Sequence, residues 1–394
     1  MKKKVDQKWL EVLDFLQYEL PKRHKNLYFQ TSEANYLAQI HSLRNELNRL
    51  ERPVINSEIA KIVASVGDAH TSIDIPVYYL CPLEFYWFKD GIYAINTTKS
   101  DEVLRYKKIT HIDGMDIGTV IAKMSTMISH ENNSYLKAML PKYLPAIEFL
   151  YGLQIARTIN GLTITYESVS GNVGEWFVPS YPFSEYQEQL NENRVAFPVD
   201  NLPLFRRDPD RHYWMEYLKK PRTLYFKYNI CKEMAEESVQ AFGERLLDVI
   251  REDAPEKLVI DMRNNTGGNS TLLDPFIDAL AKCDQINQQG RLFVIIGRDT
   301  FSSALLNVFS LKNKTHALLV GEPTGGKPNC YGEVLRVKLE QSGLRISYST
   351  KYYHLIEDDH MLSLSPDMQQ EYSIQDYLGL SDPCMEYILL SPTD

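Results

Sequence analysis

The sequence lacks the long apolar segments of a membrane protein. Its 394 residues contain no run near the 18 or so apolar residues that a transmembrane helix needs. The N-terminal stretch Met1-Lys-Lys-Lys-Val-Asp-Gln-Lys-Trp9 opens with positive charge, but the apolar region of a signal peptide does not follow it. We therefore expect a cytoplasmic protein that does not insert into membranes.

Cysteine is scarce, and the common metal-binding patterns are missing. The chain has five cysteines, Cys81, Cys231, Cys283, Cys330 and Cys384. They are odd in number and widely scattered, with no Cys-x-x-Cys pair, a pattern typical of reduced thiols. The sequence also contains no His-Glu-x-x-His motif. These absences predict no metal site, and we expect no cofactor.

An excess of positive charge is also missing. Lysine and arginine number 43 against 52 acidic residues, which gives a net charge of −9. An acidic protein is a poor match for the phosphate backbone, so we expect no nucleic-acid partner. Apolar residues make up 44% and charged residues 24%, as in an ordinary globular protein, and the length suits two or three domains.

Three regions follow from the pattern along the chain. Residues 1–75 carry apolar residues at helical spacing, and residues 76–222 mix short strands, turns and helices. From 223 to 394, strands alternate with amphipathic helices, which is typical of an α/β core. We therefore predict an α/β (α+β) protein with a helical N-terminal region.

A serine stands at the junction of a predicted strand and a predicted helix. Residues 290–297 are a short apolar run typical of a buried strand, and apolar residues at helical spacing follow Ser302 and Ser303. A serine at a helix N-terminus lies beside free backbone N–H groups, which can stabilise a developing oxyanion. Ser302 is therefore a candidate nucleophile, and a simple helix N-cap is the alternative.

A lysine follows the next predicted strand. Residues 317–320 lead into Gly321-Glu-Pro-Thr-Gly-Gly-Lys327, and if the two strands are parallel neighbours, Ser302 and Lys327 leave the sheet at one edge. A lysine can take a proton from serine only when it is neutral, and burial in an apolar pocket lowers its pKa toward that condition. Activity would then rise with pH. The alternative is a lysine at the surface.

Two further segments strengthen the catalytic interpretation. Gly267 and Gly268 follow the predicted strand that ends at Arg263, where a Gly-Gly turn can present N–H groups to a substrate oxygen; a plain tight turn is the alternative. His70 stands between Asp68 and Thr71 in a dense polar cluster, although a lone histidine is more often a packed core or surface residue.

Taken together, these segments resemble the S41 peptidases, the tail-specific or C-terminal-processing proteases. Gly67-Asp-Ala-His-Thr71 is similar to the family's Gly-Asp-Gly-His-Thr segment, and Asp261-Met-Arg-Asn-Asn-Thr-Gly-Gly268 to its Asp-x-Arg-x-Asn-x-Gly-Gly strand end. Thr300-Phe-Ser-Ser-Ala304 and the segment ending at Lys327 are similar to its nucleophile and lysine segments. Ser365-Pro-Asp367 and Asp382-Pro383 also resemble family landmarks.

The resemblance implies a serine endopeptidase that acts on peptides or unfolded proteins through an acyl-enzyme. Ser302 would be the nucleophile, with Ser303 as the fallback, and Lys327 the general base. The N–H groups of Ser303 and of Gly267 or Gly268 would form the oxyanion hole. His70 would be an auxiliary residue or an alternative base. The implied core, residues 223–394, is a ββα superhelix like that of crotonase and ClpP.

Several positions depart from the family pattern. Leu305 stands where the processing proteases have glutamate, and Tyr331 where they have the glutamine that orients the lysine. A PDZ domain is represented at best by a degenerate segment at about 91–130, without a recognisable carboxylate-binding loop. A catalytically inactive binding protein on the same fold is therefore the alternative function.

A phosphate-binding loop is a further alternative for the lysine segment. Gly321 to Lys327 fits the first seven positions of that motif. The eighth position is Pro328 instead of serine or threonine, and the residues after it alternate like a strand. Because phosphate binding needs a helix N-terminus there, the pattern disfavours a nucleotide-binding site.

Overall fold

The computed structural model describes residues 6–193 and 201–392, which divide into two compact units. The first unit comprises residues up to 193 except 132–135, together with 329–355. The second comprises 132–135, 201–328 and 356–392. Among the described residues, no helix combines the length and apolar character needed to cross a lipid bilayer.

The first unit begins with a helical layer, as the apolar spacing predicted. Its helices are α1 (Gln7–Asp14), α2 (Leu20–Arg23), α3 (Glu33–Glu46) and α4 (Arg52–Ala64), with a π-helical stretch at Phe15–Glu19. Their buried faces share one core with Leu344, Ile346 and Tyr348 of a late hairpin. That hairpin consists of β15 (Cys330–Lys338) and β16 (Arg345–Tyr353), and β1 (Ser72–Asp74) pairs with β16. The helices therefore rest on chain from far along the sequence.

The rest of the first unit is built on an antiparallel sheet. Its strands run in the order β3 (Leu83–Phe88), β4 (Gly91–Thr97), β5 (Lys108–Ile112), β7 (Gly161–Glu167) and β8 (Val173–Pro179), and β6 (Met115–Asp116) pairs with β5. The accompanying elements are α5 (Ile117–Ser125), α6 (Asn133–Tyr143), α7 (Ile147–Gly152), α8 (Phe183–Asn193) and the pair β2 (Tyr79–Leu80) and β9 (Tyr181–Pro182). β7 and β8 are consecutive antiparallel strands in which Leu162 pairs with Val178. The PDZ-like interpretation of residues 91–130 stays a prediction.

The second unit contains a mainly parallel sheet. The order is β10 (Tyr213–Lys219), β11 (Arg222–Tyr228), β12 (Lys257–Asp261), β13 (Leu292–Ile296), β14 (Leu318–Gly321) and β17 (Met368–Gln369). Every pair from β11 to β17 is parallel, and β10 is an antiparallel edge strand. Consecutive strands are neighbours, and each crossover between β11 and β14 contains a helix, as expected of an α/β protein.

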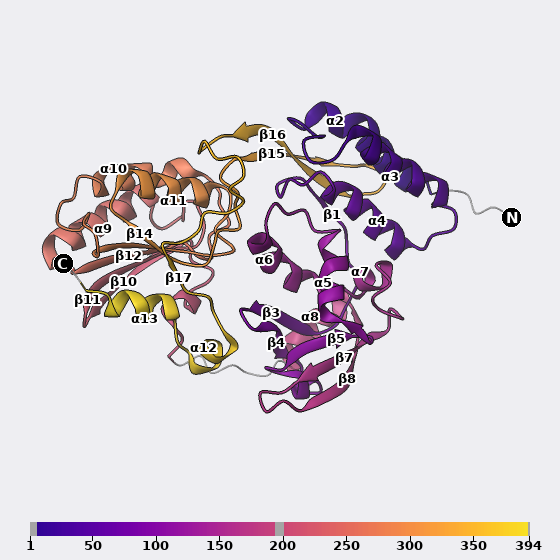
Figure 1. The fold of residues 1–394 in the computed structure, drawn as a ribbon, viewed down its shortest axis with the longest axis horizontal. Coiled ribbons are helices and arrows are strands. Elements are labelled where there is room, and N and C mark those ends of the chain that lie inside the picture. Colours follow the sequence, from indigo (N-terminus) through magenta and orange to yellow (C-terminus); the bar gives the residue numbers. More distant parts are fainter. Residues whose placement is uncertain (1–5, 194–200, 393–394) are drawn as a thin grey trace. The chain divides into compact units, whose positions relative to one another are not determined.

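Helices cover both faces of this sheet (Figure 1). The crossover helices α9 (Val239–Asp253), α10 (Asp274–Leu280) and α11 (Ser303–Lys314) lie on one face, and α13 (Pro383–Leu390) lies on the other; α12 (Ile374–Gly379) precedes α13. Phe226 packs against Phe242 and Phe276 on the first face, while Val259 and Phe293 share a core with residues of α13 on the second. All residues of β12 and β13 are buried, which explains why β13 and the centre of β12, residues 258–260, are apolar.

Candidate active site

The carboxyl ends of three neighbouring strands carry the predicted residues of the second unit. β12, β13 and β14 pair in parallel, with Asp261 opposite Ile295 and Ile296 opposite Gly321. The Gly267-Gly268 turn follows β12, Ser302 follows β13 and Lys327 follows β14. The expectation that the strands before Ser302 and Lys327 are parallel neighbours is confirmed, and their following turns start from one edge of the sheet.

Ser302 has a strained backbone. Its φ is 52° and its ψ is −127°, immediately before the first residue of α11. Such angles are rare for a residue with a side chain and cost on the order of 1–3 kcal/mol, so they persist only where the surrounding structure enforces them. The Ser302 side chain makes no capping hydrogen bond to the helix. The structure thus does not support the N-cap alternative for Ser302.

Buried hydrogen bonds hold the turn that carries Ser302. The Thr300 hydroxyl accepts from the N–H of Gly297 at 3.0 Å and donates to the carbonyl of Met262 at 2.9 Å. The N–H of Phe301 donates to the carbonyl of Asn265 at 3.1 Å. These bonds fasten the loop after β13 to the loop after β12, which is how the strain at Ser302 is maintained.

The Gly267-Gly268 turn lies against the serine. Both glycines have positive φ, 109° and 135°. A Cβ added to Gly267 would lie 2.8 Å from the Cβ of Ser302 and 3.0 Å from the nitrogen of Ser303, and one added to Gly268 would lie 2.2 Å from the carbonyl oxygen of Cys231. A side chain fits at neither position, so the two glycines allow backbone to approach the serine closely.

The two glycine N–H groups of this turn differ in their hydrogen bonding. The Gly267 N–H donates to Oδ1 of buried Asn265 at 2.9 Å, whereas no hydrogen bond within the described residues uses the N–H of Gly268 or of Ser303. The Ser303 hydroxyl donates to the carbonyl of Gly268 at 2.7 Å. Of the N–H groups expected for an oxyanion hole, those of Ser303 and Gly268 are therefore available for a ligand.

Lys327 follows a glycine pair that packs closely on the serine loop. The Gly326 N–H donates to the carbonyl of Thr300 at 3.0 Å. A Cβ on Gly325 would lie 2.1 Å from the carbonyl oxygen of Arg298, and one on Gly326 would lie 3.4 Å from the Cα of Phe301. Lys327 itself is half-buried. Its segment therefore runs directly beside the loop that leads into Ser302.

The two departures from the family pattern have structural counterparts. Leu305 is buried, and its side chain lies under Gly326, where an added Cβ would meet its Cδ2 at 2.9 Å. Tyr331 belongs to the first unit, where its ring lies 4.5 Å from the ring of Phe29 and 5.2 Å from that of His24. Apolar and aromatic packing thus occupies the positions where the family has charged or polar side chains.

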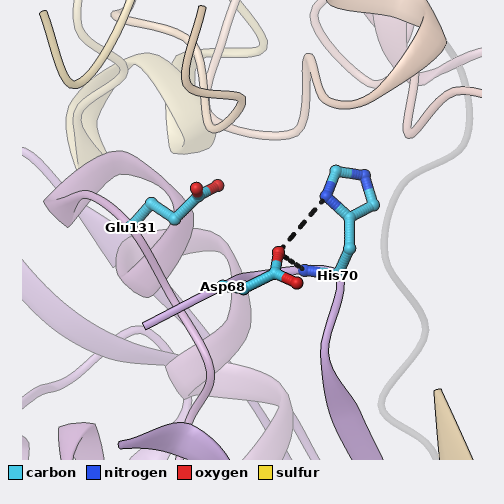
Figure 2. Close-up of side chains that lie close together, drawn as sticks. All are labelled: Asp68, His70 and Glu131. Carbon is cyan, nitrogen blue, oxygen red and sulfur yellow. Dashed lines mark hydrogen bonds and ion pairs between the residues drawn. The ribbon is translucent and has the colours of Figure 1, made fainter. Parts of the chain in front are cut away.

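His70 lies in the first unit, in a polar cluster around Asp68. The fully buried Asp68 carboxylate accepts hydrogen bonds from the Thr71 and Ser349 hydroxyls, both at 2.6 Å, and its Oδ2 lies 3.1 Å from Nε2 of His24. Its Oδ1 accepts the backbone N–H of His70 at 2.9 Å and lies 3.8 Å from the ring Nδ1 (Figure 2).

This environment sets the protonation states of Asp68 and His70. Burial alone would raise the pKa of Asp68, but the hydrogen bond from His24 and the neighbouring His70 and hydroxyls outweigh it, so the pKa is lowered. Burial lowers the pKa of His70, and the Asp68 charge and a hydrogen bond to the Tyr331 backbone only partly oppose that effect. A carboxylate beside a neutral imidazole, able to accept a proton, is the result at neutral pH.

One feature at the sheet edge was missed by sequence reasoning. Lys227 is fully buried in β11 and donates to Asp261 at 3.1 Å and to Asn264 at 2.8 Å. Arg263 binds Asp382 through two hydrogen bonds of 2.9 Å and also contacts Asp261. A lysine within the apolar stretch 224–228 of β11 was the available signal. This network holds the start of the turn that ends in Gly267.

The network also shifts pKa values. Burial lowers the pKa of Lys227 to about 8, since its one carboxylate partner only partly offsets the loss of water. Burial would raise the pKa of Asp261, but two cations, Arg263 and Lys227, and the Tyr225 hydroxyl hold it at about 2. Asp261 is therefore the charged centre on which the network depends.

Comparison with known proteins supports the fold. No protein-family model and no curated protein sequence matches the chain. Mature CPAF in complex with lactacystin superposes with a TM-score of 0.67 at 14% identity, over 98% of this chain and 97% of that one. A CPAF mutant gives 0.70 at 13% identity over the same shares. The photosystem II D1 C-terminal processing protease is less similar, with a TM-score of 0.41 at 13% identity over 93% and 94%.

At these identities the similarity concerns the fold. The chain has the fold of CPAF along nearly its whole length, and the resemblance to S41-type proteins is confirmed at that level.

Proposed function

We propose that the chain is a serine endopeptidase of the S41 type. The observation that carries the proposal is the strained Ser302 at the start of α11, with the Gly267-Gly268 turn packed against it. Acyl transfer requires a nucleophile and nearby N–H groups that are free to bind the oxyanion. Ser302 stands immediately before α11, and the Ser303 and Gly268 N–H groups beside it have no partner within the described residues. The fold shared with CPAF is consistent with this reading.

In the proposed reaction, the Ser302 hydroxyl attacks the peptide carbonyl carbon and its proton passes to the base. The oxyanion accepts hydrogen bonds from the N–H groups of Ser303 and Gly268; Gly267 takes this role only if its N–H leaves Asn265. The C–N bond then breaks as the base returns the proton to the leaving amine. Water hydrolyses the ester by the same route, and Ser302 is regenerated.

Lys327 is the proposed base, and its place beside the serine loop favours it. His70 is the alternative, because a neutral imidazole oriented by Asp68 is a competent proton acceptor. Only three residues, 328–330, separate Lys327 from Tyr331, whose backbone lies beside His70. The substrates that fit the proposal are peptides and unfolded proteins.

Hydrolysis of unfolded casein tests the proposal. Ser302→Ala should abolish cleavage, whereas Ser310→Ala, a matched change within α11, should leave it intact. Lys327→Ala should abolish turnover without unfolding the protein, with exposed Lys282→Ala as its control. Normal activity in Lys327→Ala would transfer the base role to His70. Absence of cleavage by the wild-type chain would favour the alternative, an inactive binding protein on this fold.

A further inference from the structure

The Asp68 cluster also contains side chains of the kinds that bind metal ions. A carboxylate oxygen of Asp68, a ring nitrogen of His70 and a carboxylate oxygen of Glu131 all lie within 4.8 Å of one another. Figure 2 shows the Glu131 carboxylate and the His70 ring on two sides of the Asp68 carboxylate. All three residues belong to the first unit. Three ligand atoms of the kinds that bind metals thus converge on one small region.

The donor set selects the kind of metal. An imidazole nitrogen with two carboxylate oxygens suits a divalent transition metal such as Zn²⁺, whereas Mg²⁺ and Ca²⁺ prefer all-oxygen sites. Ligand atoms that lie about 2.0–2.2 Å from a tetrahedral zinc ion are roughly 3.4 Å from one another. Side-chain rotations that move these ligand atoms by about 1 Å would therefore bring them to zinc-binding distance. Three protein ligands would leave a fourth position for water.

The surroundings of these ligands resemble the outer shell of a metal site. Hydrogen bonds from Thr71 and Ser349 and contact with His24 all go to Oδ2 of Asp68, and they fix the carboxylate with Oδ1 toward the His70 ring. The backbone of Tyr331 also lies beside the ring. Such outer contacts orient ligands before the metal arrives, and losing one typically lowers affinity about 10–100-fold.

We propose that Asp68, His70 and Glu131 form a binding site for Zn²⁺. No local pattern predicts this site, because Glu131 is remote along the chain from residues 68–70 and no short motif joins them. Binding would occupy the His70 nitrogen and remove it from proton transfer. Zinc is therefore also an inhibitor of peptide hydrolysis, a consequence that rests on the proposed function and on a role for His70 in it.

Direct titration tests the site without reference to activity. Calorimetric titration of the full chain with Zn²⁺ should show a site that Glu131→Gln weakens at least about 10-fold, because a ligand is lost. Exposed Glu102→Gln is the matched control and should bind like wild type. Glu131→His, which supplies another zinc ligand, should bind well and guards against misfolding of the glutamine variant. Equal affinity of wild type and Glu131→Gln, or no binding by either, would overturn the proposal.

Casein hydrolysis with added Zn²⁺ separates the two proposals. If zinc inhibits the wild type, EDTA should reverse the inhibition, and Glu131→Gln should need at least about 10-fold more zinc for the same effect. This result supports both the metal site and the peptidase. Zinc binding without hydrolysis under any condition keeps the metal site and rejects the peptidase. Hydrolysis by a wild-type chain that binds no zinc keeps the peptidase and rejects the metal site. Equal inhibition of wild type and Glu131→Gln places the zinc elsewhere and rejects this site.

Discussion

Gly267 and Ser302 are in contact so close that a methyl group at the glycine would lie 2.8 Å from the Cβ of the serine. The two residues follow different strands, β12 and β13, and the hydrogen bond from Phe301 to Asn265 joins their loops. The geometry of the candidate nucleophile is therefore set by a residue 35 positions earlier in the chain (302 − 267).

Gly267→Ala should abolish the proposed peptide hydrolysis. The new methyl group must displace Ser302 or the Ser303 nitrogen, and losing one oxyanion donor alone typically lowers kcat by about 100-fold or more. The measurement is the kcat for hydrolysis of casein or a derived peptide. Gly343→Ala is the control, because its φ is also positive, 71°, but nothing lies within 4 Å of the added Cβ. If both variants retain wild-type kcat, the contact has no catalytic importance.

The strain at Ser302 predicts that glycine is more stabilising than alanine at this position, the reverse of their order inside a helix. Because glycine tolerates a φ of 52° and a ψ of −127° far better than alanine, Ser302→Gly should be more stable than Ser302→Ala by about 1–3 kcal/mol. Urea unfolding of the two variants gives the difference. At Ser310, inside α11, the order should be opposite, with glycine about 1 kcal/mol less stable than alanine. The same order at both positions would show that Ser302 is unstrained.

The pH dependence of kcat/KM distinguishes the two bases. The pKa of His70 is lowered from 6.5 by burial, and a base must be unprotonated, so a His70 mechanism loses activity only as pH falls below about 6.5. If His70 is not the base, this acid limb is absent from the profile. An acid limb below 6.5 that is present in the wild type and in Lys327→Ala would assign the role to His70 and contradict our preference.

Acid should destabilise the second unit through Asp261. Its pKa in the folded chain is about 2, against 3.8 as the ordinary value, so the folded state favours the carboxylate. The resulting stability, about 2 kcal/mol, is complete above pH 4 and is lost as pH falls toward 2. Lys227 and Arg263 stay charged across this range and do not obscure the effect.

The free energy of unfolding, measured between pH 5 and pH 2, tests this contribution. Asp261→Asn should be less stable at pH 5 by about 3–5 kcal/mol, because it leaves the buried Lys227 without its carboxylate partner, and its stability should depend less on pH. Asp284→Asn, at an exposed position, should follow the wild type. Parallel pH curves for wild type and Asp261→Asn would show that the Asp261 carboxylate is not stabilised by its partners.

Local patterns were sufficient for the strands and helices around the serine. The apolar run at 290–297 became β13, the helical spacing after Ser303 became α11, and the glycine pair at 267–268 became a turn with positive φ. These features depend on neighbours in sequence, whose periodicity and glycine content can be read directly. The catalytic roles given to these residues stay predictions.

Contacts between remote segments could not be predicted. The β15–β16 hairpin packs with the N-terminal helices because Ser72 pairs with Ser347 and Ile346 enters their core. No local pattern reports such a pairing. Lys227 was missed for the same reason, since its partner Asp261 lies on the next strand and only the folded sheet brings the charges together.

Labelling with a fluorophosphonate probe tests the central claim most directly, because the probe bonds covalently to an activated serine hydroxyl. Peptide mapping by mass spectrometry should find the phosphonyl adduct on Ser302, and neither Ser302→Ala nor heat-unfolded protein should be labelled. An adduct on Ser303, or an unlabelled Ser302 in a preparation that cleaves casein, would contradict the account.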